Sequence, residues 1–143
     1  MATPARGPRP ASDLTRATRT VATLMLFEAA TLAVAAAMHL SGNVHGRGRP
    51  FDADHAGVAE AIIGVLLAAG AVALLRVPAR ARTTGIVCNV IAAAGFVNGL
   101  TMTARGGDLP DIAYHVIVLP LLIGSVVALA RTPRTSVRPR RSR

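Results

Sequence analysis

The chain of 143 residues is 52% hydrophobic, and its sixteen basic and seven acidic residues give it a formal net charge of +9. Its single cysteine excludes an internal disulfide and a cluster of thiolate metal ligands. No glycine-rich phosphate loop, nucleophile elbow or kinase motif is present, so the sequence indicates no class of enzyme and no catalytic residue.

The chain begins with a polar segment, residues 1–19, that is rich in proline, arginine, serine and threonine. It lacks apolar periodicity, which predicts a disordered basic tail. The last residues, 132–143, have the same character and predict a second, arginine-rich tail. Everything between them, residues 20–131, consists of long apolar runs and short polar connections.

Four apolar runs occupy this middle part, and each is long enough to cross a hydrocarbon core of about 30 Å as a helix. In chain order they cover residues 21–40, 56–75, 85–103 and 112–130. Lipid offers no hydrogen-bond partners to an open backbone, so such segments form helices. The sequence therefore predicts an all-α, multi-pass integral membrane protein: a four-helix bundle with up-down topology.

The arginines are unevenly distributed between the two ends of the predicted bundle. Thirteen lie before the first run, between the second and third, or after the fourth. The other two connections hold only three arginines: Arg47, Arg49 and Arg105. The same two connections also contain four aspartates. The positive-inside rule then places both termini in the cytoplasm and two short loops outside the cell membrane.

Every basic residue is an arginine, which with the abundance of alanine, glycine and valine is typical of a GC-rich genome and favours a bacterial source. The position of the arginine clusters beside the predicted spans favours binding to anionic lipid over binding to nucleic acid.

Four polar side chains fall in the outer half of the predicted spans, one on each: His39, Glu60, Asn98 and His115. With a rise of about 1.5 Å per residue, they lie about 5 to 13 Å outward of the span midpoints. An unpaired charge at the bilayer centre costs about 2.5 to 3.5 kcal/mol. We therefore expect the four side chains to form one buried polar cluster.

Two acidic residues extend this expected cluster. Glu28 lies on the same face of the first helix as His39 and would continue the cluster inward as a relay. Asp111 precedes His115 by one helical turn and would orient its imidazole from outside.

A short patch of Asp52, Asp54 and His55 lies in the first external loop. Acidic residues favour a helix N-terminus through the macrodipole, so capping of the second helix accounts for the aspartates. Capture of a cation at the surface is the alternative.

The sequence leaves the function open between two classes. The favoured one is a non-catalytic membrane component or accessory subunit, in which the polar cluster holds the helices together. The alternative is a proton-coupled or redox-linked unit, a small transporter, or a protein that handles a metal or a quinone. Two histidines and a glutamate are adequate ligands for zinc, copper or iron, but no local ligand spacing names a metal or another cofactor.

Small residues in the second span, Gly57, Ala61, Gly64 and Ala68, recur at intervals of three and four. In lipid, small residues let helices approach closely. This stripe would serve a contact with a neighbouring helix as well as one with a second copy or another membrane protein.

Overall fold

The computed structural model describes the backbone of residues 11–76 and 78–132, and side chains over residues 16–76 and 82–132. The described residues form four α-helices: α1 Ala11–Leu40, α2 Ala53–Arg76, α3 Pro78–Gly106 and α4 Leu109–Ala130. Each helix contains a segment long and apolar enough to cross a membrane. This confirms the predicted all-α fold with four such helices.

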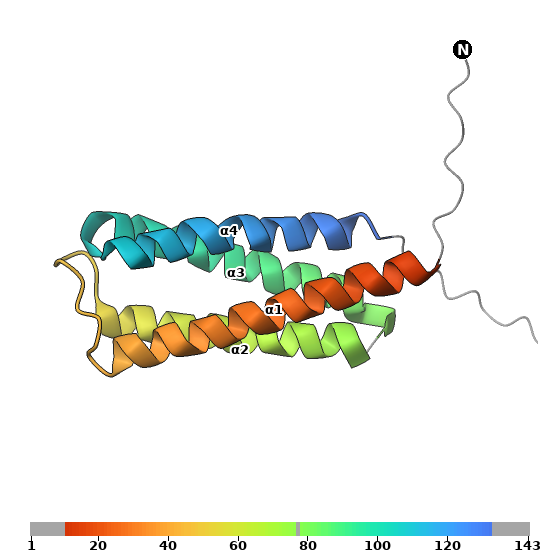
Figure 1. Ribbon diagram of the computed structural model, residues 1–143, viewed down its shortest axis with the longest axis horizontal. Helices are drawn as coiled ribbons and strands as arrows, with labels where there is room; N and C mark the ends of the chain where they lie inside the picture. The colour runs from red at the N-terminus through yellow and green to blue at the C-terminus, as the bar shows by residue number, and fades with distance from the viewer. Residues whose placement is uncertain (1–10, 77, 133–143) are drawn as a thin grey trace, which may run out of the picture.

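The four helices lie side by side, and consecutive helices run in opposite directions (Figure 1). The α1–α2 connection and the α3–α4 turn lie at one end of the bundle, which we call the loop end. The start of α1, the α2–α3 connection and the end of α4 lie at the opposite, terminal end.

Helix α1 is longer than the apolar run that predicts it. It begins at Ala11, so residues 11–19, which we expected to be part of a disordered tail, are helical. Backbone hydrogen bonds do not require apolar side chains, and alanine, leucine and arginine are good helix formers. The rest of the two predicted tails, residues 1–10 and 133–143, lies outside the described part of the chain.

Glycines on α2 allow the closest helix packing. A Cβ atom at Gly57 would lie 2.8 Å from the Leu40 side chain, and one at Gly64 would lie 3.4 Å from Leu32. Both neighbours belong to α1, and α1 and α2 make the most extensive contact between any two helices. Two members of the predicted stripe thus serve a contact inside the bundle.

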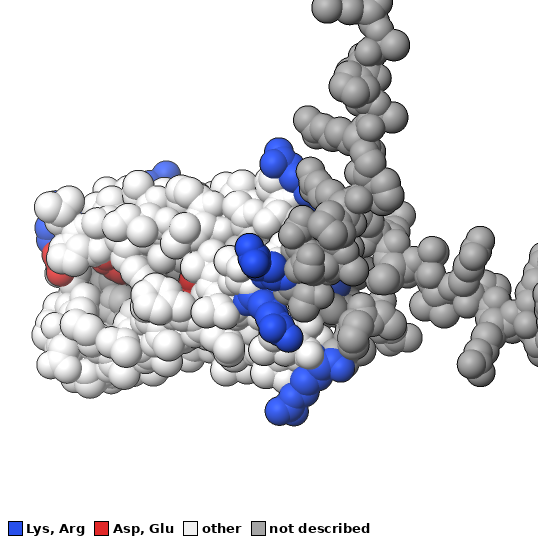
Figure 2. Space-filling model, turned by 45° about the vertical axis from the view of Figure 1, so that its right-hand side comes forward, with Lys and Arg blue, Asp and Glu red and all other residues white. Residues whose placement is uncertain are grey.

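The centre of the bundle is apolar, and so is most of its outer surface. Met25, Leu67 and Leu122 are completely buried. Outside, however, Phe27 is 63% exposed and Val65 is 71% exposed. Figure 2 shows the result on one face: most of the surface is uncharged, several arginines gather near the terminal end, and a few acidic and basic side chains lie toward the loop end.

Arg82, at the terminal end, ties α3 to the end of α4. Its Nε donates to the backbone oxygen of Leu129 at 2.8 Å, and a second guanidinium nitrogen donates to that of Ala130 at 2.7 Å. The last carbonyls of a helix have no partner within the helix. Arg82 therefore caps α4 from a neighbouring helix.

Candidate functional site

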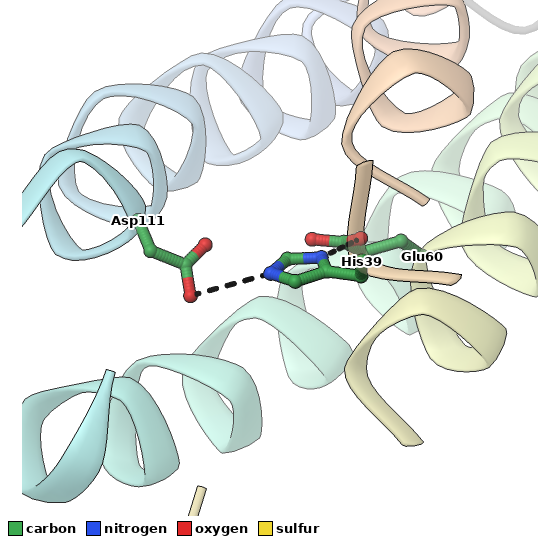
Figure 3. Close-up of side chains that lie close together, drawn as sticks. All are labelled: His39, Glu60 and Asp111. Carbon is green, nitrogen blue, oxygen red and sulfur yellow. Dashed lines mark hydrogen bonds and ion pairs between the residues drawn. The ribbon is translucent and has the colours of Figure 1, made fainter. Parts of the chain in front are cut away.

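A layer of polar side chains lies inside the bundle near the loop end. His39 comes from α1, Glu60 from α2 and Asp111 from α4 (Figure 3). Nδ1 of His39 lies 2.7 Å from Oε2 of Glu60, and Nε2 of His39 lies 4.0 Å from Oδ2 of Asp111. One ligand atom from each of the three residues lies within 4.8 Å of the others. We call these three residues the charge layer.

The charge layer is buried. His39 is 3% exposed and Glu60 7%, and the side chain of Asp111 is 10% exposed. Within the described part of the chain, Nε2 of His39 and Oδ2 of Asp111 have no hydrogen-bond partner. Their separation of 4.0 Å is too long for a hydrogen bond. Two buried polar atoms therefore face each other unbonded.

His115 lies beside the charge layer, one turn after Asp111 on α4. Its Nδ1 lies 2.9 Å from the backbone oxygen of Asp111, and 3.9 Å from the Asp111 carboxylate. Only a protonated Nδ1 can donate to a carbonyl oxygen, so Nε2 is left as the acceptor of the neutral ring. That Nε2 faces α3 at Gly99, where a Cβ atom would collide with it. The absence of a side chain at Gly99 makes room for the imidazole.

A cavity of about 320 Å³ adjoins the charge layer and lies between α2, α3 and α4. Apolar side chains such as Ile63 and Phe96 form most of its wall. Glu60, Asp111 and His115 add polar groups to that wall, so the cavity reaches two of the three members of the charge layer.

The loop between α1 and α2 closes the bundle above His39. Phe51 is 7% exposed, and its ring centroid lies 5.8 Å from that of His39. The backbone nitrogen of Arg47 donates to the carbonyl oxygen of Gly106 at 2.6 Å, and Nε donates to that of Gly107 at 2.8 Å. These bonds connect the α1–α2 loop to the turn between α3 and α4.

Asn98 does not belong to the buried cluster, contrary to the prediction. It is exposed, at the rim of the cavity. The buried asparagine of α3 is Asn89, which is 0% exposed and donates to the backbone oxygen of Gly85 at 2.8 Å. Nine residues separate the two asparagines, which at about 3.6 residues per turn is two and a half turns. They therefore lie on opposite faces of α3.

Glu28 is buried, at 1% exposed, but it lies apart from the charge layer. Neither of its carboxylate oxygens has a hydrogen-bond partner among the described residues. The Thr31 hydroxyl donates to the backbone oxygen of Glu28 at 2.9 Å, not to its carboxylate, and lies 2.8 Å from the Tyr114 hydroxyl. The predicted relay from Glu28 to His39 is thus not a continuous chain of hydrogen bonds.

The surface patch at residues 52–55 is a helix cap. Oδ1 of Asp52 accepts a hydrogen bond from the backbone N–H of His55 at 3.0 Å, and Oδ2 lies 3.1 Å from its Nδ1. The backbone N–H of His55, assisted by its side chain, lowers the pKa of Asp52 below its usual range. Asp54 is exposed in the first turn of α2. The patch lies outside the charge layer.

Sequence reasoning missed two features of this site. It assigned Asp111 only to His115, although its carboxylate also faces His39 across the bundle. It also gave no role to Phe51, the one phenylalanine of the loop, whose place five residues before the second apolar run is the only signal in the sequence. Comparison of the chain with known protein families, curated proteins and solved structures gives no match.

Proposed function

We propose that this protein is a multi-pass membrane protein, with both termini in the cytoplasm, that binds a cation at the charge layer. Its outer surface supports the membrane environment. Large apolar side chains on the helices point outward, among them Phe27, Val65 and Ile117, each more than 60% exposed. Soluble monomers rarely expose apolar patches larger than a few hundred Å². Lipid is the solvent that suits such a surface.

The arginines support the orientation. Within the described side chains, the terminal end carries Arg16, Arg19, Arg76, Arg82 and Arg131. Arginine near the ends of spans is retained on the cytoplasmic side, where it also attracts anionic lipid. The loop end, and with it the charge layer, then belongs to the outer half of the membrane.

The single observation that supports cation binding is that two buried carboxylates lie close together. Glu60 and Asp111 each place an oxygen within 4.8 Å of the other and of His39. Two unit negative charges at that distance repel by about 3.5 kcal/mol at an effective dielectric constant of about 20. Among the described residues, no arginine forms an ion pair with either carboxylate. A bound cation would offset this repulsion.

The cavity supports a route to the site, because Glu60 and Asp111 both line it. A cation that enters the cavity meets both carboxylates without a rearrangement of the helices. The protein then acts as a binding or transport component of the membrane rather than as an enzyme.

Binding can be measured on the full chain in lipid nanodiscs after treatment with a chelator. The probes are Na⁺, Ca²⁺, Zn²⁺ and tetraphenylphosphonium, each followed by calorimetry. We expect one probe at least to bind with a 1:1 stoichiometry, and Asp111→Asn to weaken it tenfold or more.

Asp108→Asn is the matched control. Asp108 precedes α4, makes no side-chain cap hydrogen bond and does not line the cavity. We expect it to bind like the parent protein. If Asp111→Asn is unstable, Glu60→Gln replaces it as the test variant. Absence of binding for all four probes, or equal binding by the parent and the charge-layer variant, would overturn the proposal.

Orientation has its own test. In a Cys88→Ala background, single cysteines are placed at Ser41, at the loop end, and at Thr132, at the terminal end. A membrane-impermeant maleimide added to intact cells is expected to label Ser41→Cys and to spare Thr132→Cys until the cells are lysed. The opposite labelling pattern would reverse the proposed topology.

A further inference from the structure

We infer that the cation is a divalent transition metal of the zinc class, bound between Nε2 of His39 and Oδ2 of Asp111, with Glu60 positioning the His39 ring. The inference rests on the proposed function, because it specifies the cation and the atoms that hold it. Its independent support is the pair of buried atoms that face each other without a hydrogen bond.

The state of the His39 ring follows from its contact with Glu60. Oε2 of Glu60 lies 2.7 Å from Nδ1, and a carboxylate can only accept, so Nδ1 carries a proton and donates it. In the neutral ring, Nε2 then carries a lone pair. Oδ2 of Asp111, 4.0 Å away, is also an acceptor. A metal ion can join two such acceptors, because it accepts an electron pair from each.

The spacing suits a metal ion. Zinc binds histidine nitrogen and carboxylate oxygen at about 2.0 to 2.2 Å, so two of its tetrahedral ligand atoms lie about 3.4 Å apart. The observed 4.0 Å needs a movement of about half an ångström, which a side-chain rotation supplies. Alkali and alkaline-earth ions prefer oxygen ligands throughout, whereas an imidazole ligand favours zinc and its neighbours.

Glu60 then accepts a hydrogen bond from the ring nitrogen of His39 that does not bind the metal. Histidine ligands of metals almost always donate their other ring N–H to a carboxylate, a carbonyl or water, which fixes the orientation of the ring. The 2.7 Å contact between Glu60 and His39 already provides this arrangement. A divalent ion would also balance the two negative charges of the layer.

The test is metal binding by the full chain in nanodiscs, with Zn²⁺ followed by calorimetry and Co²⁺ by its visible absorption bands. We expect one ion per chain and a loss of affinity of at least 100-fold for His39→Gln and for Asp111→Asn. Glu60→Gln is expected to lose 10- to 100-fold, in line with other partners of metal-binding histidines, while it keeps the Co²⁺ spectrum of the parent.

His45→Gln is the matched control, because His45 is an exposed histidine of the α1–α2 loop that does not line the cavity. We expect it to bind Zn²⁺ like the parent. Loss of binding in this variant would move the site to the surface and overturn the inference. Unchanged binding in His39→Gln would overturn it too. If His39→Gln does not fold, Asp111→Asn serves as the test variant. Zn²⁺ is then expected to raise the unfolding temperature of the parent protein but not that of Asp111→Asn.

The two proposals fail in different ways. If tetraphenylphosphonium, Na⁺ or Ca²⁺ binds and Asp111→Asn abolishes it, while Zn²⁺ and Co²⁺ do not bind, the metal inference is wrong and cation binding stands. If no probe binds, both are wrong.

Discussion

The hydrogen bond between His39 and Glu60 allows a double-mutant test of the charge layer in the metal-free protein. The variants are His39→Met, Glu60→Met and the double variant, each with a side chain of similar volume. The two atoms lie 2.7 Å apart, and the residues are 3% and 7% exposed, so water screens the contact little. The pair joins α1 to α2.

The expected costs differ between the two single variants. His39→Met leaves the Glu60 carboxylate buried without its partner, and an uncompensated buried charge costs about 3 to 5 kcal/mol. Glu60→Met leaves only the N–H of a neutral ring unsatisfied, which costs about 1 to 3 kcal/mol. The double variant leaves neither group behind, so it is expected to be more stable than His39→Met, since apolar replacement of a buried pair is often close to neutral.

The structure supplies the assay. Cys88 is the only cysteine, and it is 6% exposed in the core. Its reaction with a maleimide during titration of mixed micelles with SDS therefore reports the fraction of unfolded protein. His55→Met, which alters an exposed pair, is the control and should shift stability by less than about 1 kcal/mol. Additive costs in the double variant would refute the coupling.

Two further predictions concern positions next to the charge layer. Gly99→Ala should destabilise the bundle by about 1 to 3 kcal/mol, because its Cβ would collide with His115. The control is Gly124→Ala, which has open space at that position and should show no loss of stability in the same Cys88 assay. The His55 backbone N–H and side chain lower the pKa of Asp52. The cap therefore stabilises the fold at neutral pH, and this stabilisation is lost as the pH falls through the Asp52 pKa. In His55→Ala, NMR titration should show that pKa rising only in part toward its usual range; an unchanged value would disprove a contribution of the imidazole.

The sequence predicts the number and order of the helices well, because the length of each apolar run is a direct physical requirement of a span. It predicts their bounds less well. Helix α3 begins at Pro78, ahead of the expected residue 85, and ends at Gly106. Hydropathy reports where apolar side chains stop, whereas the helical backbone continues into polar residues as long as its hydrogen bonds are satisfied.

The polar layer shows what depth alone can predict. His39, Glu60 and His115 were placed at similar depth in the outer half of the spans, and the structure buries all three near the loop end. Depth does not give rotation about the helix axis, and Asn98 is exposed for that reason. Which atoms meet depends on helix rotation and on Gly99, where the backbone of α3 comes close to His115.

The contacts of Arg47 with Gly106 and Gly107 work as a latch between the two loops. With the Phe51 ring packed at a tilt against His39, they cover the histidine side of the charge layer. An ion coordinated by His39 would leave in that direction no faster than the latch opens. Exchange of the ion on this side then requires loop motion, and replacing Arg47 would speed that exchange while the route through the cavity and the coordinate bonds stay the same.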